Sequence, residues 1–391
     1  ELMLGIRDVK IMTITDGTIE TGQLLIEDGT IKAVGKDVDL SLCTKIIEGK
    51  GRVVTPGLID AHTHVGLSES GVGSEGRDTN EGINPLTPGL RARDGINMHD
   101  QAFEIFRKSG ITTVGILPGS GNILGGTGLA LKCKGTIVDE AVLKDPIGMK
   151  AALGENPKGL YGGQKKSPAT RMGNAALLRG ALQKAVDYLD KLNHSNDQPE
   201  KTRDKDSEAL LPVIKGEIPL IIHAHRHDDI VTAIRICKEF GVRCILDHVT
   251  DGHMVRDIMK REDIHCGVGP TMHYGSKVEN KDRDFRTPVV FDREHIPFCF
   301  ITDHPVVDGR NLILTASIAT QWGLPDDSAL RAITLASAQH LGVDARVGSI
   351  EAGKDADLIL WSGNPLEFTS FVDMTIIDGE IVYERGMQTS C

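Results

Sequence analysis

Two absences in the sequence each argue against a class of partner. No apolar run approaches the ~20 residues that a membrane-spanning helix needs. Basic residues are the minority, with 44 Lys and Arg against 55 Asp and Glu, so the formal net charge is −11. Proteins that bind nucleic acid without sequence preference usually carry a basic patch, which this balance opposes. We therefore expect neither a membrane nor a nucleic acid among the partners.

The cysteines also lack any recognisable framework. They are scattered, odd in number and in no Cys-x-x-Cys motif, which is typical of reduced thiols in the cytosol. The N-terminus shows no basic segment followed by a small-residue cleavage site, as a signal peptide would. We therefore expect a cytoplasmic protein. The seven cysteines are Cys43, Cys133, Cys237, Cys244, Cys266, Cys299 and Cys391.

The middle of the chain alternates strand-like and helix-like segments. This alternation is typical of an α/β fold with parallel strands, and eight strands with interleaved helices predict a (β/α)8 TIM-like barrel. No helix is evident between the second and third strands, so that unit fits the pattern least well. The strands are predicted near 58–64, 112–117, 129–132, 148–153, 220–224, 243–248, 265–268 and 298–303.

The two ends of the chain share a different pattern, made of short strands. Asp28-Gly29 and Asp378-Gly379 are strong hairpin turn signals between such strands. Neither end has enough strands to bury its own apolar faces. We therefore predict a small β-sandwich domain built from residues 1–56 plus 348–391, flanking a catalytic barrel domain of residues 57–347.

The barrel begins with His62-Thr63-His64. Residues i and i+2 of a strand face the same side, roughly 6.5–7 Å apart. Two imidazoles on one face can bind the same cation, although the motif alone is a weak signal.

Other predicted strands end in similar side chains. The fifth strand ends in His223-Ala224-His225, the sixth in His248 and the eighth in Asp303. Functional residues of such barrels lie at the C-terminal ends of the strands, so these side chains are expected to meet His62 and His64. His223 and His225 face the same side, and periodicity does not decide between them.

Two stretches resemble signatures of the amidohydrolase superfamily, most closely its imidazolonepropionase-related subgroup. They are Pro56-Gly57-Leu58-Ile59-Asp60-Ala61-His62-Thr63-His64 and Gly348-Ser349-Ile350-Glu351-Ala352-Gly353-Lys354-Asp355-Ala356-Asp357-Leu358-Ile359-Leu360-Trp361. The resemblance implies a sandwich of the two chain ends beside a metal-dependent barrel. It also implies a set of metal ligands for one or two divalent ions, Zn²⁺ foremost: His62, His64, His223, His248 and Asp303.

The fourth strand supplies a ligand in many members of that family, and two residues here qualify. Glu155 follows the apolar run at the barrel mouth, and a carboxylate is a natural hard ligand. Lys150 lies inside the strand, where it needs a partner or a modification such as carboxylation. We favour Glu155; a carboxylated Lys150 would favour two bridged ions.

The predicted activity is hydrolysis of a C–N bond in an amide, cyclic amide or related small molecule. Asp303 would take the proton of the attacking water, and His248 or His225 would stabilise the oxyanion. Arg171, Tyr161 and His273 are candidates for substrate binding, with Arg171 suited to a carboxylate.

Two other functions compete with this prediction. A dipeptidase or prolidase-like hydrolase is an alternative within the enzymes. A non-catalytic binding homologue would be expected to have lost ligands that this sequence keeps. The resemblance further implies a homo-oligomer.

Overall fold

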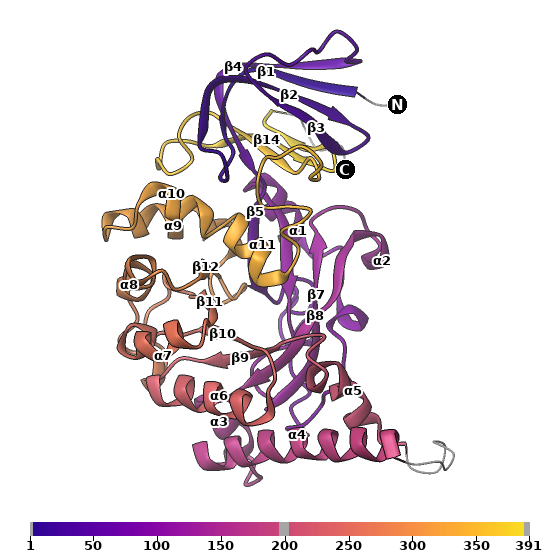
Figure 1. Cartoon of the computed structure of the whole chain (residues 1–391), viewed down its shortest axis with the longest axis vertical. Coiled ribbons are helices and arrows are strands. Elements are labelled where there is room, and N and C mark those ends of the chain that lie inside the picture. Colours follow the sequence, from indigo (N-terminus) through magenta and orange to yellow (C-terminus); the bar gives the residue numbers. More distant parts are fainter. Residues whose placement is uncertain (1–2, 195–202, 387–391) are drawn as a thin grey trace.

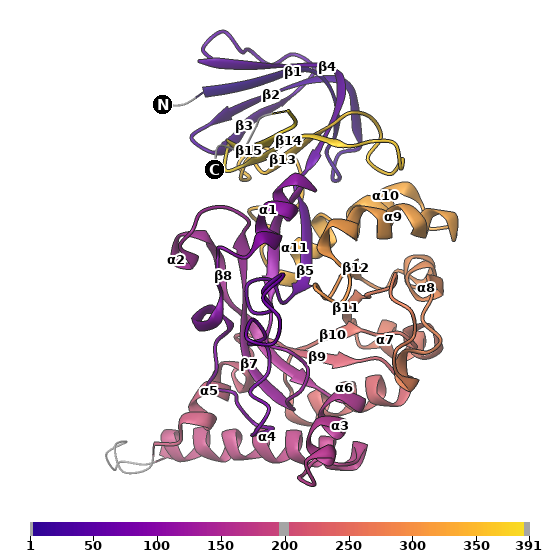
Figure 2. The ribbon, with the colours of Figure 1, turned by 180° about the vertical axis from the view of Figure 1, so that it is seen from behind.

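The computed structural model describes residues 3–194 and 203–386. Strands from both ends of the chain form one part, and the central residues form a barrel beside it (Figure 1). Helix α4 (Arg171–His194) lies across the end of the molecule opposite the first part (Figures 1 and 2). None of the helices in the described ranges is both long and apolar enough to cross a membrane.

The first part is one seven-stranded sheet that folds over on itself. Its order is β15-β14-β13-β4-β1-β2-β3, so strands of the two chain ends meet where β13 pairs with β4. Ile6, Leu24, Val54, Leu358 and Ile376 belong to the apolar core between the two halves. This arrangement confirms the predicted sandwich of the termini, whereas the exact domain boundaries stay a prediction. The strands are β1 (Met3–Met12), β2 (Thr18–Glu27), β3 (Thr30–Gly35), β4 (Lys45–Pro56), β13 (Leu358–Trp361), β14 (Val372–Ile377) and β15 (Glu380–Glu384).

The second part is an eight-stranded, nearly closed barrel. Its strands follow the chain in order, and the residues after β12 return to the end of β5, where the backbone nitrogen of Asp303 donates to the carbonyl of His62 (3.1 Å). The predicted barrel is therefore confirmed. The strands are β5 (Leu58–Thr63), β6 (Ile111–Ile116), β7 (Leu124–Lys132), β8 (Val142–Ala152), β9 (Leu220–Ala224), β10 (Cys244–His248), β11 (His265–Val268) and β12 (Phe298–Phe300).

Strand β7 departs from the expected all-parallel barrel. It pairs antiparallel with both β6 and β8. Only residues 117–123 connect β6 to β7, and a parallel crossover needs a dozen residues or more. The weak third unit of the sequence pattern is thus a reversed strand rather than a strand–helix repeat.

Helices cover the barrel between the parallel strands. Asp100 caps α1 by accepting a hydrogen bond from the backbone of Ala102 (3.1 Å), and it also accepts one from Gly66 (3.0 Å) in the loop after β5. The helices are α1 (Gln101–Lys108), α2 (Val138–Ala141), α3 (Glu155–Gly163), α4 (Arg171–His194), α5 (Lys205–Ile214), α6 (His227–Phe240), α7 (Arg256–Arg261), α8 (Arg286–Glu294), α9 (Leu312–Gln321), α10 (Asp326–Arg331) and α11 (Leu335–Leu341).

Close contacts between the sheet of the termini and the barrel include the start of β5 and a buried ion pair. Gly57 connects β4 to β5, and a Cβ atom there would lie 1.9 Å from Oγ1 of Thr112, so only glycine fits. Lys132, at the end of β7, forms a buried ion pair with Asp355 (2.6 Å) beside β13. The barrel strand that carries His62 therefore starts from a fixed position.

The six cysteines in the described ranges are free thiols, and four of them are buried. Cys391 lies outside the described residues.

Candidate metal centre

Side chains from the C-terminal ends of several strands meet inside the barrel mouth. Nε2 of His62 and Nε2 of His64 lie 3.3 Å and 2.9 Å from Oδ1 of Asp303. The His62 and His248 rings are 5.0 Å apart. Ligand atoms of His62, His248 and Asp303 lie within 4.8 Å of one another, as a shared cation requires. The structure thus brings together residues that are far apart in the sequence.

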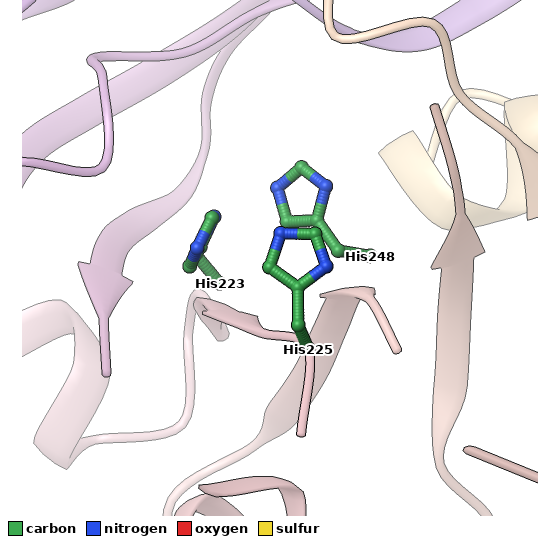
Figure 3. Close-up of side chains that lie close together, drawn as sticks. All are labelled: His223, His225 and His248. Carbon is green, nitrogen blue, oxygen red and sulfur yellow. The ribbon is translucent and has the colours of Figure 1, made fainter. Parts of the chain in front are cut away.

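A second group of histidines adjoins the first and shares His248 with it. Figure 3 shows His223, His225 and His248 grouped together, and their ligand atoms also lie within 4.8 Å of one another. The rings of His223 and His248 are 4.3 Å apart, and those of His225 and His248 are stacked at 4.7 Å. His223 on β9 and His225 just after it therefore both reach the cluster, so their positions do not decide which of them is the metal ligand.

Hydrogen bonds fix the tautomer of three of these histidines. Nδ1 of His64 contacts the carbonyl of Leu117 and Nδ1 of His248 contacts that of Gly269, each at 2.7 Å. Nδ1 of His62 contacts the Asp247 carboxylate at 2.6 Å. These partners only accept, so Nδ1 carries the proton and the lone pair of Nε2 faces the cluster. In many metalloproteins, a hydrogen bond from the ring nitrogen that does not bind the metal orients the histidine ligand in this way.

A cation fits this arrangement because several buried acceptors lack a donor. Nε2 of His248 and Nδ1 of His223 have no hydrogen-bond partner among the described residues. Nε2 of His64, whose proton is on Nδ1, faces a carboxylate oxygen of Asp303, so two acceptors oppose each other. Burial lowers the pKa of His64, His223 and His248, which keeps these imidazoles neutral. Neutral imidazoles and a carboxylate are a suitable donor set for Zn²⁺.

Asp303 is held as a carboxylate by its neighbours. Burial alone would raise its pKa, but the neighbouring imidazoles of His62, His64 and His248 lower the pKa well below its usual range. Its backbone φ of 55° lies in the left-handed region, which is uncommon for a residue other than glycine. Backbone strain of this kind occurs often at functional sites.

Of the two candidates on the fourth predicted strand, the structure brings Lys150 into the cluster. Its Nζ is fully buried and lies 3.4 Å from Nε2 of His62. Burial lowers the pKa of Lys150 to about 8, and Asp247 and Asp303 oppose that shift. Glu155 instead begins α3 and turns away: its Oε1 accepts a hydrogen bond from the backbone of Glu279 (3.0 Å). The favoured ligand of the sequence analysis is therefore not part of the cluster.

A cavity of about 500 Å³ opens above the cluster. Its lining includes His64, His223, His225, His273 and Asp303, so the predicted substrate residue His273 faces it.

The other two substrate candidates have structural roles. Nε of Arg171 donates to the Asp229 carboxylate at 2.9 Å. The buried Tyr161 bonds to Asn122 (2.5 Å) and to the carbonyl of Glu81 (3.3 Å). Neither side chain lines the cavity.

Three residues beside the site were not predicted from the sequence. Asp247 contacts His62 from within β10, and His340 of α11 lies 2.9 Å from the other carboxylate oxygen of Asp247. Arg283 lines the cavity from the loop before α8. Only Asp247 had a signal in the sequence, as a charged residue at the end of an apolar strand next to His248.

Comparison with known proteins agrees with this geometry. The amidohydrolase family matches residues 53–382. The chain is 28% identical over 396 residues to amidohydrolase tasK of Hapsidospora irregularis. The alignment covers 93% of this chain but 40% of tasK, so the chain spans less than half of that relative. It is 25% identical over 388 residues to imidazolonepropionase of Mesorhizobium japonicum, covering 91% of each.

A solved structure gives a similar result. The amidohydrolase from Thermotoga maritima MSB8 is 36% identical and superposes with a TM-score of 0.94, covering 98% of this chain and all of that one. The resemblance predicted from the two sequence signatures is thereby confirmed. Because the family match spans most of the chain, the protein belongs to the amidohydrolase family.

Proposed function

We propose that the protein is a metal-dependent hydrolase that cleaves a C–N bond of an amide or cyclic amide in a small molecule. Family membership supports hydrolysis at C–N bonds as the class of reaction. The observation that carries the metal dependence is the convergence of Nε2 lone pairs from His62, His64 and His248 on the Asp303 carboxylate. The free thiols support a cytosolic setting.

The proposed ligands are His62, His64, His223, His248 and Asp303. A divalent cation held by them, with Zn²⁺ as the best match to imidazole and carboxylate, would lower the pKa of a water toward ~7 and polarise the scissile carbonyl. Lys150 is the proposed further ligand in carboxylated form. Its burial and its 3.4 Å distance from His62 support that role over Glu155, whose carboxylate is engaged by the backbone of Glu279.

The side chains have separate roles in the proposed reaction. Asp303 accepts the proton of the attacking water and returns it to the leaving nitrogen; its ionised state and its position at the cavity support this role. His248 carries its proton on Nδ1, bonded to Gly269, so its other nitrogen suits a ligand better than a donor. This supports His225 as the group that polarises the substrate carbonyl.

Elemental mass spectrometry of the purified wild type, Lys150→Ala and Glu155→Ala tests the ligand set. We expect metal in the wild type, a loss of about half or more in Lys150→Ala and no change in Glu155→Ala. Assays with a panel of N-acyl amino acids, dipeptides and cyclic amides then test hydrolysis. A wild type that takes up no Zn²⁺ and hydrolyses none of the panel would contradict the proposal.

A dipeptidase is the second candidate function. Dipeptides satisfy the same C–N chemistry, and the cavity of about 500 Å³ has room for one. The panel distinguishes this candidate, since a dipeptidase should prefer the peptides over the cyclic amides.

A further inference from the structure

Arg283 has an unusual environment on the wall of the cavity. It lies between β11 and α8 and lines the same cavity as His223 and Asp303. Its Nε and Nη1 atoms are buried and have no hydrogen-bond partner among the described residues. A guanidinium has five N–H donors in a planar fork, so three of them, one on Nε and two on Nη1, are left without an acceptor.

The neighbouring cations are matched, which makes the unmatched Arg283 distinctive. Arg171 pairs with Asp229 at 2.9 Å. Lys277, the other cation that lines the cavity, bonds to Asn156 and lies 3.7 Å from Oε1 of Glu279. No carboxylate in the described ranges lies within ion-pair distance of Arg283, although such pairs are common elsewhere in the chain.

Arg283 as a whole is partly exposed, but donor atoms that are buried without an acceptor are costly, so they normally have a partner in the working protein. Burial lowers the pKa of Arg283 to about 10, while Asp303 and Glu279 oppose the shift. The guanidinium therefore stays charged at neutral pH. A carboxylate satisfies two donors of the fork at once, with two parallel N–H···O bonds.

We propose that Arg283 binds a carboxylate of the substrate, and hence that the substrates are small amides or cyclic amides bearing a free carboxylate. The inference rests on the proposed hydrolysis at the neighbouring cluster and names its substrate class. It assigns to Arg283 the role that the sequence analysis gave to Arg171, whose guanidinium already pairs with Asp229. The distance along the cavity wall between Arg283 and the cluster determines which C–N bond reaches Asp303.

Binding is tested without turnover, on chelator-treated protein, by calorimetry. The ligands are acetate, N-acetylglycine, succinate and glutarate, each paired with its uncharged amide. We expect at least one carboxylate to bind wild type about 10–100-fold more tightly than Arg283→Met, as for hydrogen bonds to a charged group, and the amides to bind both equally weakly. Arg286→Met is the matched control, because Arg286 is exposed in the same segment and pairs with Asp284 at 2.9 Å.

Hydrolysis is tested in parallel with N-acyl amino acids and dipeptides, each as the free acid and as the carboxamide. Wild type should prefer the acids about 10–100-fold in kcat/KM, and Arg283→Met should lose that preference. If Arg283→Met does not fold, Arg283→Lys should reduce the preference, and the preference of wild type itself remains measurable.

The outcomes separate the two proposals. Carboxylate binding that depends on Arg283, without hydrolysis of any compound, supports the inference and contradicts the proposed function. Hydrolysis of acids and carboxamides at similar rates, together with carboxylate binding that is equal in wild type and Arg283→Met, overturns the inference and leaves the proposed function standing. Absence of carboxylate binding and of any acid preference in wild type also overturns it.

Discussion

Oδ2 of Asp247 accepts a hydrogen bond from Nδ1 of His62 at 2.6 Å, and both side chains are fully buried. The other oxygen of the same carboxylate lies 2.9 Å from Nε2 of His340. Burial alone would raise the pKa of Asp247, but the two imidazoles lower the pKa well below its usual range. One carboxylate therefore fixes the tautomer of a proposed ligand and connects it to helix α11, whose Ala338 and Leu341 belong to the same apolar cluster as Ile221 of β9.

Replacing Asp247 by Asn should weaken metal binding without removing a ligand. The amide keeps the shape of the side chain but no longer enforces the proton on Nδ1 of His62, so the affinity for Zn²⁺ should fall about 10–100-fold. Competition with a chromophoric chelator measures this affinity. Asp257→Asn, in the exposed part of α7, is the control and should leave it unchanged. An affinity for Asp247→Asn within twofold of wild type would contradict the orienting role.

His340 should make the stability depend on pH in a defined direction. Burial opposes its protonation, but Cys299 and Asp247 raise its pKa well above its ordinary value. A raised pKa stabilises the folded state fully below the unfolded pKa of about 6.5, and the contribution is lost as pH rises toward the folded pKa. His265 lies close enough to His340 that a positive charge on one imidazole disfavours protonation of the other.

The free-energy gap between wild type and His340→Gln should therefore narrow as pH rises above about 6.5. The slope is at most about 1.4 kcal/mol per pH unit for one proton. Urea unfolding of chelator-treated protein at pH 6, 7, 8 and 9 measures the gap. The exposed His99→Gln serves as control and should show no such trend. A gap that stays constant or widens with pH would show that His340 is neutral in the folded protein.

Lys150 should form a carbamate. Its neutral amine adds to CO₂ with release of a proton, and a pKa of about 8 leaves roughly a tenth of the amine neutral at pH 7. Protein reloaded with Zn²⁺ in ¹³C-bicarbonate should show a carbamate carbon by NMR that Lys150→Ala lacks. Lys144→Ala, in the same strand but partly exposed, should retain the signal. A wild-type spectrum without this carbon would exclude the carboxylated ligand.

The fold could largely be read from the sequence, because apolar runs and turn signals are local properties. Asp28-Gly29 and Asp378-Gly379 do connect strands of the sheet formed by the termini. The reversed β7 is the exception. Its cause was also present in the sequence, since the seven residues 117–123 are too few for a helical crossover.

The site was predictable only where its residues end a strand. His62, His64, His223, His248 and Asp303 belong to this group. Asp247 also stands at a strand end, but its contact with His62 could not be predicted, because consecutive residues of a regular strand face opposite sides. The backbone of His248 has a φ of 82°, and Asp247 and His248 both contact His62.

Contacts between loops that are far apart in the sequence cannot be predicted from local sequence patterns either. Glu155 was the favoured ligand because it follows an apolar strand, yet it bonds to the backbone of Glu279, which lies 124 residues away. Arg283 likewise lines the cavity from the loop before α8, where no strand end marks it in the sequence. Position relative to a strand end predicted which side chains come near the cavity but not which way they turn.

The contact between barrel and terminal sheet offers a separate test of stability. Nζ of Lys132 lies 2.6 Å from Asp355 and 3.2 Å from Asp357, and it also pairs with Asp378. Without this cation, carboxylates would remain together in a buried place where burial already raises the pKa of Asp357 to about 6. Lys132→Met should therefore cost about 3–5 kcal/mol of unfolding free energy at pH 8.

The control and the pH dependence identify the cause of that loss. Lys134→Met removes a more exposed cation that pairs with Asp378 at 2.9 Å, and it should cost at most about 1 kcal/mol. Removing Lys132 raises the folded-state pKa of the remaining carboxylates, so the variant loses stability as pH rises. The deficit measured by urea unfolding should thus grow between pH 5 and pH 8. A deficit equal to that of Lys134→Met at every pH would mean that the lost packing of the Lys132 stem, rather than the uncompensated carboxylates, accounts for the change.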